Sequence, residues 1–330
     1  MAGAVATTTY RRGSGVAGRA RRVGGAVAGP LATIALASFV ISVGLSLAPG
    51  DPVAQVVGPR PTPERIETAR TALGLDKNAF ERYGAWVGDA VQGDLGRSIA
   101  QRESVTSLIE PRLATTALLV GLAGLLILVV GVSLGIAGGA VRALGPAVAI
   151  ATALAIAVPT FVAAQILVDW FALDRDWFPA TGAGSGFADR LYHLTLPAIA
   201  LALSWTAYVA QITRTAIREE YGREHVETAR GRGLPATSIF RRHVLRNAAI
   251  PIVTISGLTL AGLVASSVVV EVAFGLDGVG SLLVQSILAK DYNVVQGIAV
   301  MLVIVFVLVT TSIDALHVAL DPRLRRGSSR

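Results

Sequence analysis

The fold of this chain is decided by the most polar long segment between two apolar spans, Arg218–Pro251, which reads REEYGREHVETARGRGLPATSIFRRHVLRNAAIP. Long apolar runs precede and follow it. Within it, residues 227–235 read as a short helix that is stopped by Gly231, Gly233 and Pro235, because glycine and proline end helices. The segment therefore predicts a compact charged knob that joins two apolar helices.

The composition places the chain in the membrane class. Of its 330 residues 53% are hydrophobic and 15% charged, and the mean hydropathy is +0.61, which is too apolar for an ordinary soluble domain. Six runs of about 18 residues or more are each long enough to span a bilayer. These runs are Leu31–Ala48, Leu113–Val141, Ala143–Val168, Leu194–Thr213, Asn247–Val270 and Tyr292–Ile313.

The distribution of charge predicts which side each loop faces. The N-terminal tail, the turn at Arg142, residues 214–246 and the C-terminal tail carry 18 of the 29 basic residues. The opposite segments carry 11 basic and 16 acidic residues. Because Lys and Arg favour cytoplasmic loops, we expect both termini and the polar segment to be cytoplasmic. The pI near 10.3 then reflects topology and anionic lipid, and DNA binding is disfavoured.

Two segments flank the first span. Residues 1–30 are rich in Gly, Ala and Arg and predict a disordered basic tail, and residues 321–330 at the other end are expected to form a cytoplasmic tail. A signal peptide is the alternative for the N-terminus. The apolar run 31–48 exceeds the usual core of about 7 to 15 residues and lacks a small-residue cleavage site, so we predict a retained first span.

Residues 49–112 form the one sizeable insertion, which we expect on the external side. Thr62 before Pro63 predicts a helix start, and Phe80, Tyr83 and Val87 give a second helix an apolar face. These elements are too small to form a core of their own. We predict a packed cover over the bundle, which is also a plausible contact for a substrate-delivery protein.

Glycine and proline residues shape the second and third spans. Gly131, Gly135 and Gly139 recur at four-residue spacing and predict close approach of another helix. Pro159 in the middle of the third span predicts a kink whose freed carbonyl needs a partner inside the bundle.

Several kinds of enzyme are excluded by the motifs that the sequence lacks. The only lysines, Lys77 and Lys290, follow Asp76 and Ala289, so no phosphate-binding P-loop is present. The four histidines form no His-Glu-x-x-His pair, and no serine nucleophile elbow occurs. The absence of cysteine excludes disulfides and thiolate metal sites.

Charges within or near spans are candidate functional groups because their burial is costly. Asp314 precedes His317 by three residues, so the two share a helix face and are expected to pair. Asp169 and Glu271 lie near external span ends, where we expect them to reach headgroups or water. For all three carboxylates we favour a structural role over a proton relay.

The polar segment itself allows two interpretations. Its arginines suit a juxtamembrane helix on anionic lipid. That interpretation does not account for the interspersed Glu219, Glu220, Glu224 and Glu227, nor for the stop at residues 231–235 and the second amphipathic helix that follows. A knob of mixed charge suits a socket on another protein better.

The pattern Glu227-x-Ala229-x-x-x-Gly233 resembles the coupling-loop signature of ABC importer permeases. Together with Arg242-His243-x-Leu245-Arg246-Asn247, it resembles the dipeptide/oligopeptide subfamily, and the long external insertion resembles that of its first permease subunit. The similarity extends over about residues 28–325. The further matching motifs are Ala48–Pro52, Gly93–Ser98, Leu194-x-Leu196-Pro197, Thr213-Arg214 and Asp321-Pro322-Arg323.

The chain departs from the family pattern at two informative positions. Thr228 stands where alanine is frequent, a small-for-small change. Asp277 stands where proline is usual, yet Asp277-Gly278 still predicts a turn. We therefore expect the external re-entrant loop 271–291 to be kept, with altered stiffness and charge.

The resemblance implies an all-α, six-span type I importer permease, with residues 113–320 as the core domain and residues 218–247 as the coupling segment. It implies a bacterial inner-membrane location and four kinds of partner: a homologous second permease, two ATPase domains in separate or fused chains, an extracytoplasmic substrate-binding lipoprotein and a peptide. No cofactor or metal is expected in this chain, since ATP and Mg would be bound by the ATPases.

The resemblance also assigns candidate sites. The predicted ATPase-coupling residues are Glu224, Glu227, Thr228, Ala229, Arg230, Arg232, Gly233, Leu234 and Pro235. The predicted residues of the external loop or gate are Glu271, Phe274, Asp277, Gly278 and Gly280. Glu227 and Arg230 would contact a groove on the ATPase, Ala229 would allow close approach, and Gly233 would supply the turn.

Two functions from other classes stay open at this stage. A proton-driven secondary transporter would use Asp314, and a non-transporting scaffold would use the external insertion. Dipeptides, longer peptides, glutathione, haem and nickel chelates all remain candidate cargo.

Overall fold

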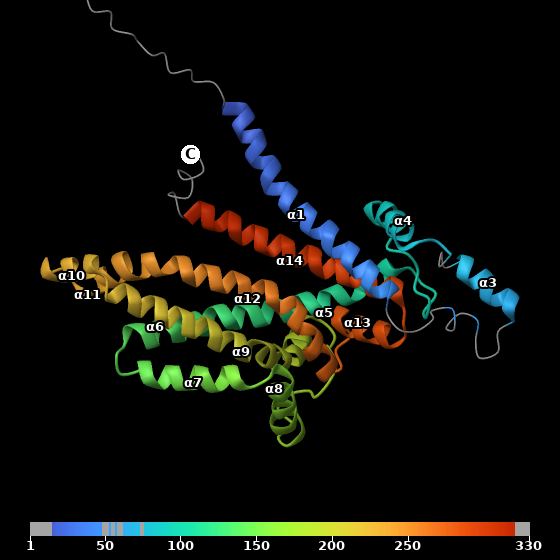
Figure 1. Cartoon of the computed structure of the whole chain (residues 1–330). Coiled ribbons are helices and arrows are strands. Elements are labelled where there is room, and N and C mark those ends of the chain that lie inside the picture. The colour runs from blue at the N-terminus through green and yellow to red at the C-terminus, as the bar shows by residue number, and fades with distance from the viewer. Residues whose placement is uncertain (1–14, 48–52, 54–56, 58–61, 73–75, 321–330) are drawn as a thin grey trace, which may run out of the picture.

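Most of the long helices run roughly along one axis, while the segment Thr160–Leu173 lies across it (Figure 1). The computed structural model describes residues 15–47, 53, 57, 62–72 and 76–320. Among these residues the only bridge between extended segments pairs Arg97 with Ser104, so the predicted all-α fold is confirmed. The helices are α1 (Gly15–Ser46), α3 (Pro63–Ala72), α4 (Ala79–Val91), α5 (Val105–Leu126), α6 (Val132–Ala140), α7 (Gly145–Ala157), α8 (Thr160–Leu167), α9 (Phe187–Tyr221), α10 (Glu224–Gly231), α11 (Ala236–Ile239), α12 (Leu245–Ala273), α13 (Val279–Leu288) and α14 (Tyr292–Leu320), with π-helical turns η1 (Ile127–Gly131), η2 (Val168–Leu173) and η3 (Phe240–Val244).

The described residues contain five helices that are long and apolar enough to cross a membrane. The third predicted span is instead a broken pair, Gly145–Ala157 and Thr160–Leu173, whose two parts meet at 96°. Pro159 lies at the break because it has no N–H to continue the helix. The predicted bend is confirmed, and it is a complete interruption of the helix.

The N-terminal prediction needs a correction. Helix α1 begins at Gly15, so residues 15–30, which we expected to belong to a disordered tail, are helical. Extending an existing helix costs much less free energy than nucleating a new one, and Ala and Arg are good helix formers. The helix of the first span therefore continues toward the N-terminus. Residues 1–14 and the predicted tail 321–330 lie outside the described part of the chain.

Helix α9 is the central element of the bundle and packs against α5, α6, α7, α8 and α12. Its contact with η1 and α6 depends on the glycines at four-residue spacing. A Cβ added at Gly131, Gly135 or Gly139 would lie 3.3 Å or less from atoms of α9, at Val209, Thr213 and Ile217 respectively. The backbones of these segments therefore approach more closely than any residue with a side chain would allow.

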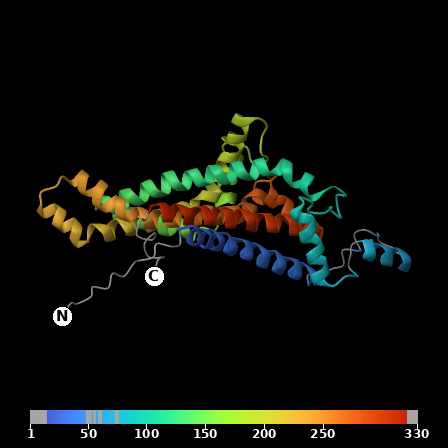
Figure 2. The ribbon, with the colours of Figure 1, turned by 90° about the horizontal axis from the view of Figure 1, so that it is seen from above.

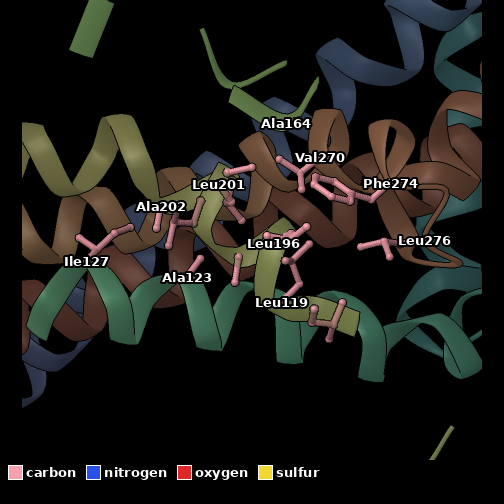
Figure 3. Packing of buried hydrophobic residues seen from close by; sticks show 14 of the residues in the cluster. Leu119, Ala123, Ile127, Ala164, Leu196, Leu201, Ala202, Val270, Phe274 and Leu276 are labelled. Atoms are coloured by element: carbon pink, nitrogen blue, oxygen red, sulfur yellow. The ribbon is translucent and has the colours of Figure 1, made fainter. Parts of the chain in front are cut away.

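The main core lies where α5, α8, α9 and α12 meet (Figure 3). Leu119, Leu201 and Val270 are fully buried there, and Phe274 is 1% exposed. At the helix break the Ser204 hydroxyl on α9 donates to the carbonyl of Val158 at 2.9 Å and to the carbonyl of Ala155 at 3.4 Å, the group that the missing N–H of Pro159 leaves free. The predicted partner for this carbonyl inside the bundle is therefore present.

The insertion between α1 and α5 contains the two predicted helices. The hydroxyl of Thr62 accepts a hydrogen bond from the Arg65 N–H at 3.4 Å, which confirms the helix start before Pro63. Helix α4 lies against α1, where the Tyr83 hydroxyl donates to the carbonyl of Ala35 at 3.0 Å and the Phe39 ring contacts Phe80. The insertion therefore packs on the first span.

We expect Gly135→Ala to destabilise the bundle. The new methyl group would collide with Thr213 and the Ala210 carbonyl, and such overpacking costs about 1–3 kcal/mol. The measurement is thermal unfolding of the purified protein in one detergent.

Gly121→Ala on α5 is the matched control, because nothing lies within 4 Å of its added Cβ. Its midpoint of unfolding should stay the same or rise, as alanine favours helices. Equal midpoints for the two variants would show that the α6–α9 contact is not close-packed.

Candidate functional site

The two regions that the sequence singled out lie at opposite ends of the bundle (Figures 1 and 2). Helices α10 and α11 form one end, and α13 lies toward the other end, near the insertion with α3 and α4. Helix α9 has 35 residues, so it extends about 50 Å between them. Helix α1 starts, and α14 ends, on the side of α10; which membrane face this is stays a prediction.

Helix α10 has well-defined ends. Glu224 and Glu227 lie in its first turn, where acidic side chains complement the helix dipole. At its C-terminal end Gly233 has a φ of +72°, its N–H donates to the Arg230 carbonyl at 2.9 Å, and the Leu234 N–H donates to the Ala229 carbonyl at 3.3 Å. This is a Schellman motif, which requires a left-handed residue and favours glycine.

The two faces of α10 differ sharply. Val226 is 0% and Ala229 4% exposed, and both pack in an apolar cluster with Ile217 of α9, Val244 of η3 and Ala248 of α12. Ala229 therefore provides close approach to its own chain. The other predicted coupling residues are exposed: Glu224, Glu227, Thr228, Arg230, Arg232, Gly233, Leu234 and Pro235.

Aromatic and polar contacts hold α10 to the adjoining helices. The rings of Tyr221 and Phe240 stack at 6.4 Å, and the Arg230 guanidinium lies 5.7 Å from the Tyr221 ring centroid. His225 of α10 lies 3.6 Å from a carboxylate oxygen of Glu220 on α9 and 3.2 Å from the Asn247 amide nitrogen on α12. Helices α9, α10 and α12 thus form one unit at this end.

At the opposite end, the structure corrects the prediction for Glu271. We expected this carboxylate to reach headgroups or water, but Glu271 is 0% exposed. One of its oxygens accepts from the Thr116 hydroxyl of α5 at 2.7 Å, and the other accepts from the Ser281 N–H of α13 at 3.0 Å. Glu271 is buried because it caps the N-terminus of α13, whose N–H groups have no partner within that helix.

The remaining predicted gate residues surround this carboxylate. A Cβ on Gly278 would collide with the Glu271 carboxylate, and one on Gly280 would lie 2.6 Å from Cα of Val268. Phe274 is a core residue and is seen next to Val270 in Figure 3. The two glycines and the phenylalanine therefore hold the turn between α12 and α13 in place.

Asp277, the residue at which the sequence departs from the proline of the family pattern, is on the surface of the same turn. Its carboxylate accepts from Nε of Arg112 on α5 at 2.8 Å, with the Asp277 side chain 73% and the Arg112 side chain 19% exposed. An exposed pair of this kind contributes about 0.2–1 kcal/mol. The ion pair ties the turn to α5.

A second buried carboxylate was not predicted from the sequence. Asp291, between α13 and α14, is 1% exposed, and one of its oxygens accepts from the Ser98 hydroxyl and from the Ala100 N–H. The two partners lie more than 190 residues earlier in the chain, so local patterns carry no signal of this pairing. Asp291 anchors the turn after α4 to the core.

The remaining charged candidates form no site in the described part of the chain. Asp169 accepts from the Gln165 amide at 2.8 Å on its own helix. Asp314 is exposed, and the side chain of His317 lies outside the described residues, so their pairing stays a prediction. No group of three His, Asp or Glu side chains is arranged to hold a metal ion among the residues described.

Residues 127–326 match the family described as "Binding-protein-dependent transport system inner membrane component". A probable peptide ABC transporter permease of Sinorhizobium fredii is 32% identical over 303 residues, 89% of this chain and 96% of that protein. A putative peptide transport system permease of Brucella abortus is 35% identical over 298 residues, 88% of this chain and 94% of that protein. A glutathione transport system permease of Escherichia coli K12 is 31% identical over 300 residues, 90% of this chain and 96% of that protein.

A solved structure of the MetNI methionine ABC transporter in an inward-facing conformation has the same fold. It superposes with a TM-score of 0.55 at 18% identity and covers 66% of this chain and 97% of that chain. The sequence match extends over most of the chain and includes the coupling segment. The chain therefore belongs to the family of binding-protein-dependent transport system inner membrane components, the multi-pass inner-membrane permease subunits of ABC importers.

Proposed function

We propose that this chain is the first permease subunit of a peptide importer and that residues 224–235 couple it to a partner ATPase. A homologous second permease forms the other half of the pathway, and two ATPase domains bind ATP and Mg below it. An extracytoplasmic lipoprotein delivers the peptide. The names of the relatives support the substrate class, and the long insertion before α5 supports the first of the two permease positions.

The observation that carries this proposal is the two-faced geometry of α10. Its apolar face is buried in its own chain, while its charged residues project outward from a helix held at both ends. A helix that only lay on lipid would have its apolar face toward the bilayer. The outward charged face fits a polar groove on another protein.

The contacts of α10 give the coupling a mechanical route. The apolar cluster joins α9, α10, η3 and α12, so force applied to α10 is carried by packed side chains to two spans together. Packed units of this kind move as rigid bodies about hinges. ATPase closure would therefore tilt α9 and α12 together and switch the pathway between its inward-facing and outward-facing states.

The opposite end supplies the external closure. The α12–α13 turn is fixed by Glu271 and remains attached to α12, which the coupling segment moves. Helix α4 is packed on α1, and the turn that follows it is anchored at Asp291. We place the binding protein's contact on this external surface and the gate role on turn 271–280.

The proton-driven alternative rested on Asp314. That residue is exposed on α14, and the family match and its relatives favour the importer over a proton-coupled transporter. The test between them is uptake of a radiolabelled dipeptide into vesicles that contain the assembled complex. Uptake should require ATP on the side of the vesicle membrane where the ATPase domains lie. It should continue when the proton gradient is collapsed.

Gly233→Val should uncouple transport from ATP hydrolysis. A left-handed conformation costs a residue with a side chain about 1–2 kcal/mol, and a β-branched residue tolerates it least, so the end of α10 should unwind. The complex should still assemble, while ATP hydrolysis no longer rises on addition of peptide and binding protein.

Gly233→Asn is the matched control, because asparagine adopts left-handed φ far more readily. It should keep most of the stimulation. If Gly233→Val is stimulated as strongly as the wild type in the assembled complex, the coupling role of this turn is wrong.

Glu271→Gln should loosen α13. Both oxygens of Glu271 accept hydrogen bonds, and an amide nitrogen cannot accept, so one buried donor is left unpaired at a cost of about 1–3 kcal/mol. We expect a lower unfolding midpoint and slower peptide uptake than in wild type.

The same change at the exposed Glu110 of α5 controls for the loss of one carboxylate and should leave both quantities unchanged. Wild-type stability of Glu271→Gln would contradict the assignment of Glu271 as the cap of α13.

A further inference from the structure

A histidine of α10 to which the proposed coupling assigns no role lies between two partners of opposite chemistry. His225 faces Glu220 near the C-terminal end of α9 and Asn247 in the first turn of α12. Its side chain is 41% exposed, and that of Glu220 is 16% exposed. A cavity of about 370 Å³ at this end is lined in part by Glu220, Arg223 and Asn247. The histidine is therefore open to exchange protons with water.

The contact with Asn247 requires the neutral form of His225. The side-chain nitrogen of Asn247 donates to the His243 carbonyl at 2.8 Å, and a carbonyl only accepts, so this atom is the N–H₂ group of the amide. The same nitrogen lies 3.2 Å from Nε2 of His225. Because an amide nitrogen only donates, Nε2 has to accept, and it accepts only when it carries no proton. The neutral ring therefore joins α10 to α12.

The contact with Glu220 favours the protonated form of the same ring. Oε2 of Glu220 is buried and has no hydrogen-bond partner in the described part of the chain, and Nε2 of His225 lies 3.6 Å from it. The other carboxylate oxygen, Oε1, lies 3.5 Å from Nε of Arg223. A buried carboxylate oxygen without a donor is costly, and a protonated Nε2 supplies that donor. The charged ring therefore joins α10 to α9.

The other ionisable groups around the ring offer it no second anion. His243 of η3 lies against it, with ring centroids 6.3 Å apart, and Arg223 in the turn before α10 is itself beside Glu220. Helix α11 contributes no titratable side chain, and Glu224, the neighbour on α10 itself, is exposed. Among the described residues, Glu220 supplies the one carboxylate within ion-pair distance of His225.

We propose that His225 is a positioning residue for α10, and that its Nε2 exchanges Asn247 for Glu220 when it takes up a proton. This inference rests on the proposed coupling role of residues 224–235 and adds a protonation step to it. Histidine is the side chain that ordinarily changes charge between about pH 5 and 8. Protonation adds the bond to Glu220, so the tie between α10 and α9 is present at acidic pH and is lost as the pH rises. Coupling through α9 is therefore stronger in acid.

The test is a stimulation factor: the rate of ATP hydrolysis with peptide and binding protein divided by the rate without them. It is measured on the assembled complex in nanodiscs at about pH 6 and about pH 8. Wild type is compared with Glu220→Gln at each pH, so that the pH dependence of the partner subunits cancels. The wild-type factor should exceed that of the variant about threefold at the lower pH, the effect of one partly exposed ion pair. The two factors should be nearly equal at the higher pH.

Two substitutions at His225 separate the effect of charge from that of packing. His225→Gln keeps an acceptor for Asn247 but has no group that titrates, so its stimulation factor should match that of Glu220→Gln at both pH values. His225→Lys carries its charge at both, so it should keep the high factor at the higher pH as well. If His225→Lys behaves like His225→Gln, charge at this position has no role and the inference is wrong.

His193 provides the matched control, because its Nδ1 also lies beside a carboxylate, 3.2 Å from Asp189, at the opposite end of α9. His193→Gln should keep the wild-type dependence on pH. Loss of that dependence in His193→Gln, or wild-type factors in Glu220→Gln at both pH values, overturns the inference. Either result leaves the proposed function intact while peptide still stimulates the wild-type complex. A wild-type complex that peptide stimulates at neither pH refutes the proposed function itself.

Discussion

The structure depends on one constraint: inside a bilayer no water is available to bond a free backbone group, so each such group must find a partner within the protein. The two irregular places in the spans obey it with single polar side chains. Ser204 serves the carbonyls of Ala155 and Val158 at the break before Pro159, and Glu271 serves the Ser281 N–H in the first turn of α13. These bonds allow a broken helix and a re-entrant helix to exist beside regular spans.

Close packing around α9 turns these local solutions into one body. The glycines of η1 and α6 let the backbone of these segments lie directly on α9. The apolar cluster that contains Val226 joins α10 to α9 and α12. In the proposed coupling, movement at α10 would therefore be carried to the spans through these packed side chains.

The sequence predicted what depends on local chemistry. The stop at Gly233, the break at Pro159, the start at Thr62 and the apolar spans all follow from backbone geometry and hydropathy, and the structure shows each of them. It failed where a residue's environment is formed by distant segments. Glu271 near a span end was expected in water, and only the folded chain brings Thr116 and Ser281 to it. The pairing of Asp291 with Ser98 gave no signal. The helix of residues 15–30 was missed because the composition suggested a tail, whereas the helix of the adjoining span continues through it.

The central claim is that α10 moves as one body with α9, and paired spin labels on the cysteine-free chain test it most directly. One pair, at Thr228 and Ile199, joins α10 to the middle of α9; the other, at Thr228 and Ser46, joins α10 to α1. Between the nucleotide-free and the vanadate-trapped complex, the first distance should stay constant and the second should change. A change in the first distance with the second unaltered would contradict the account.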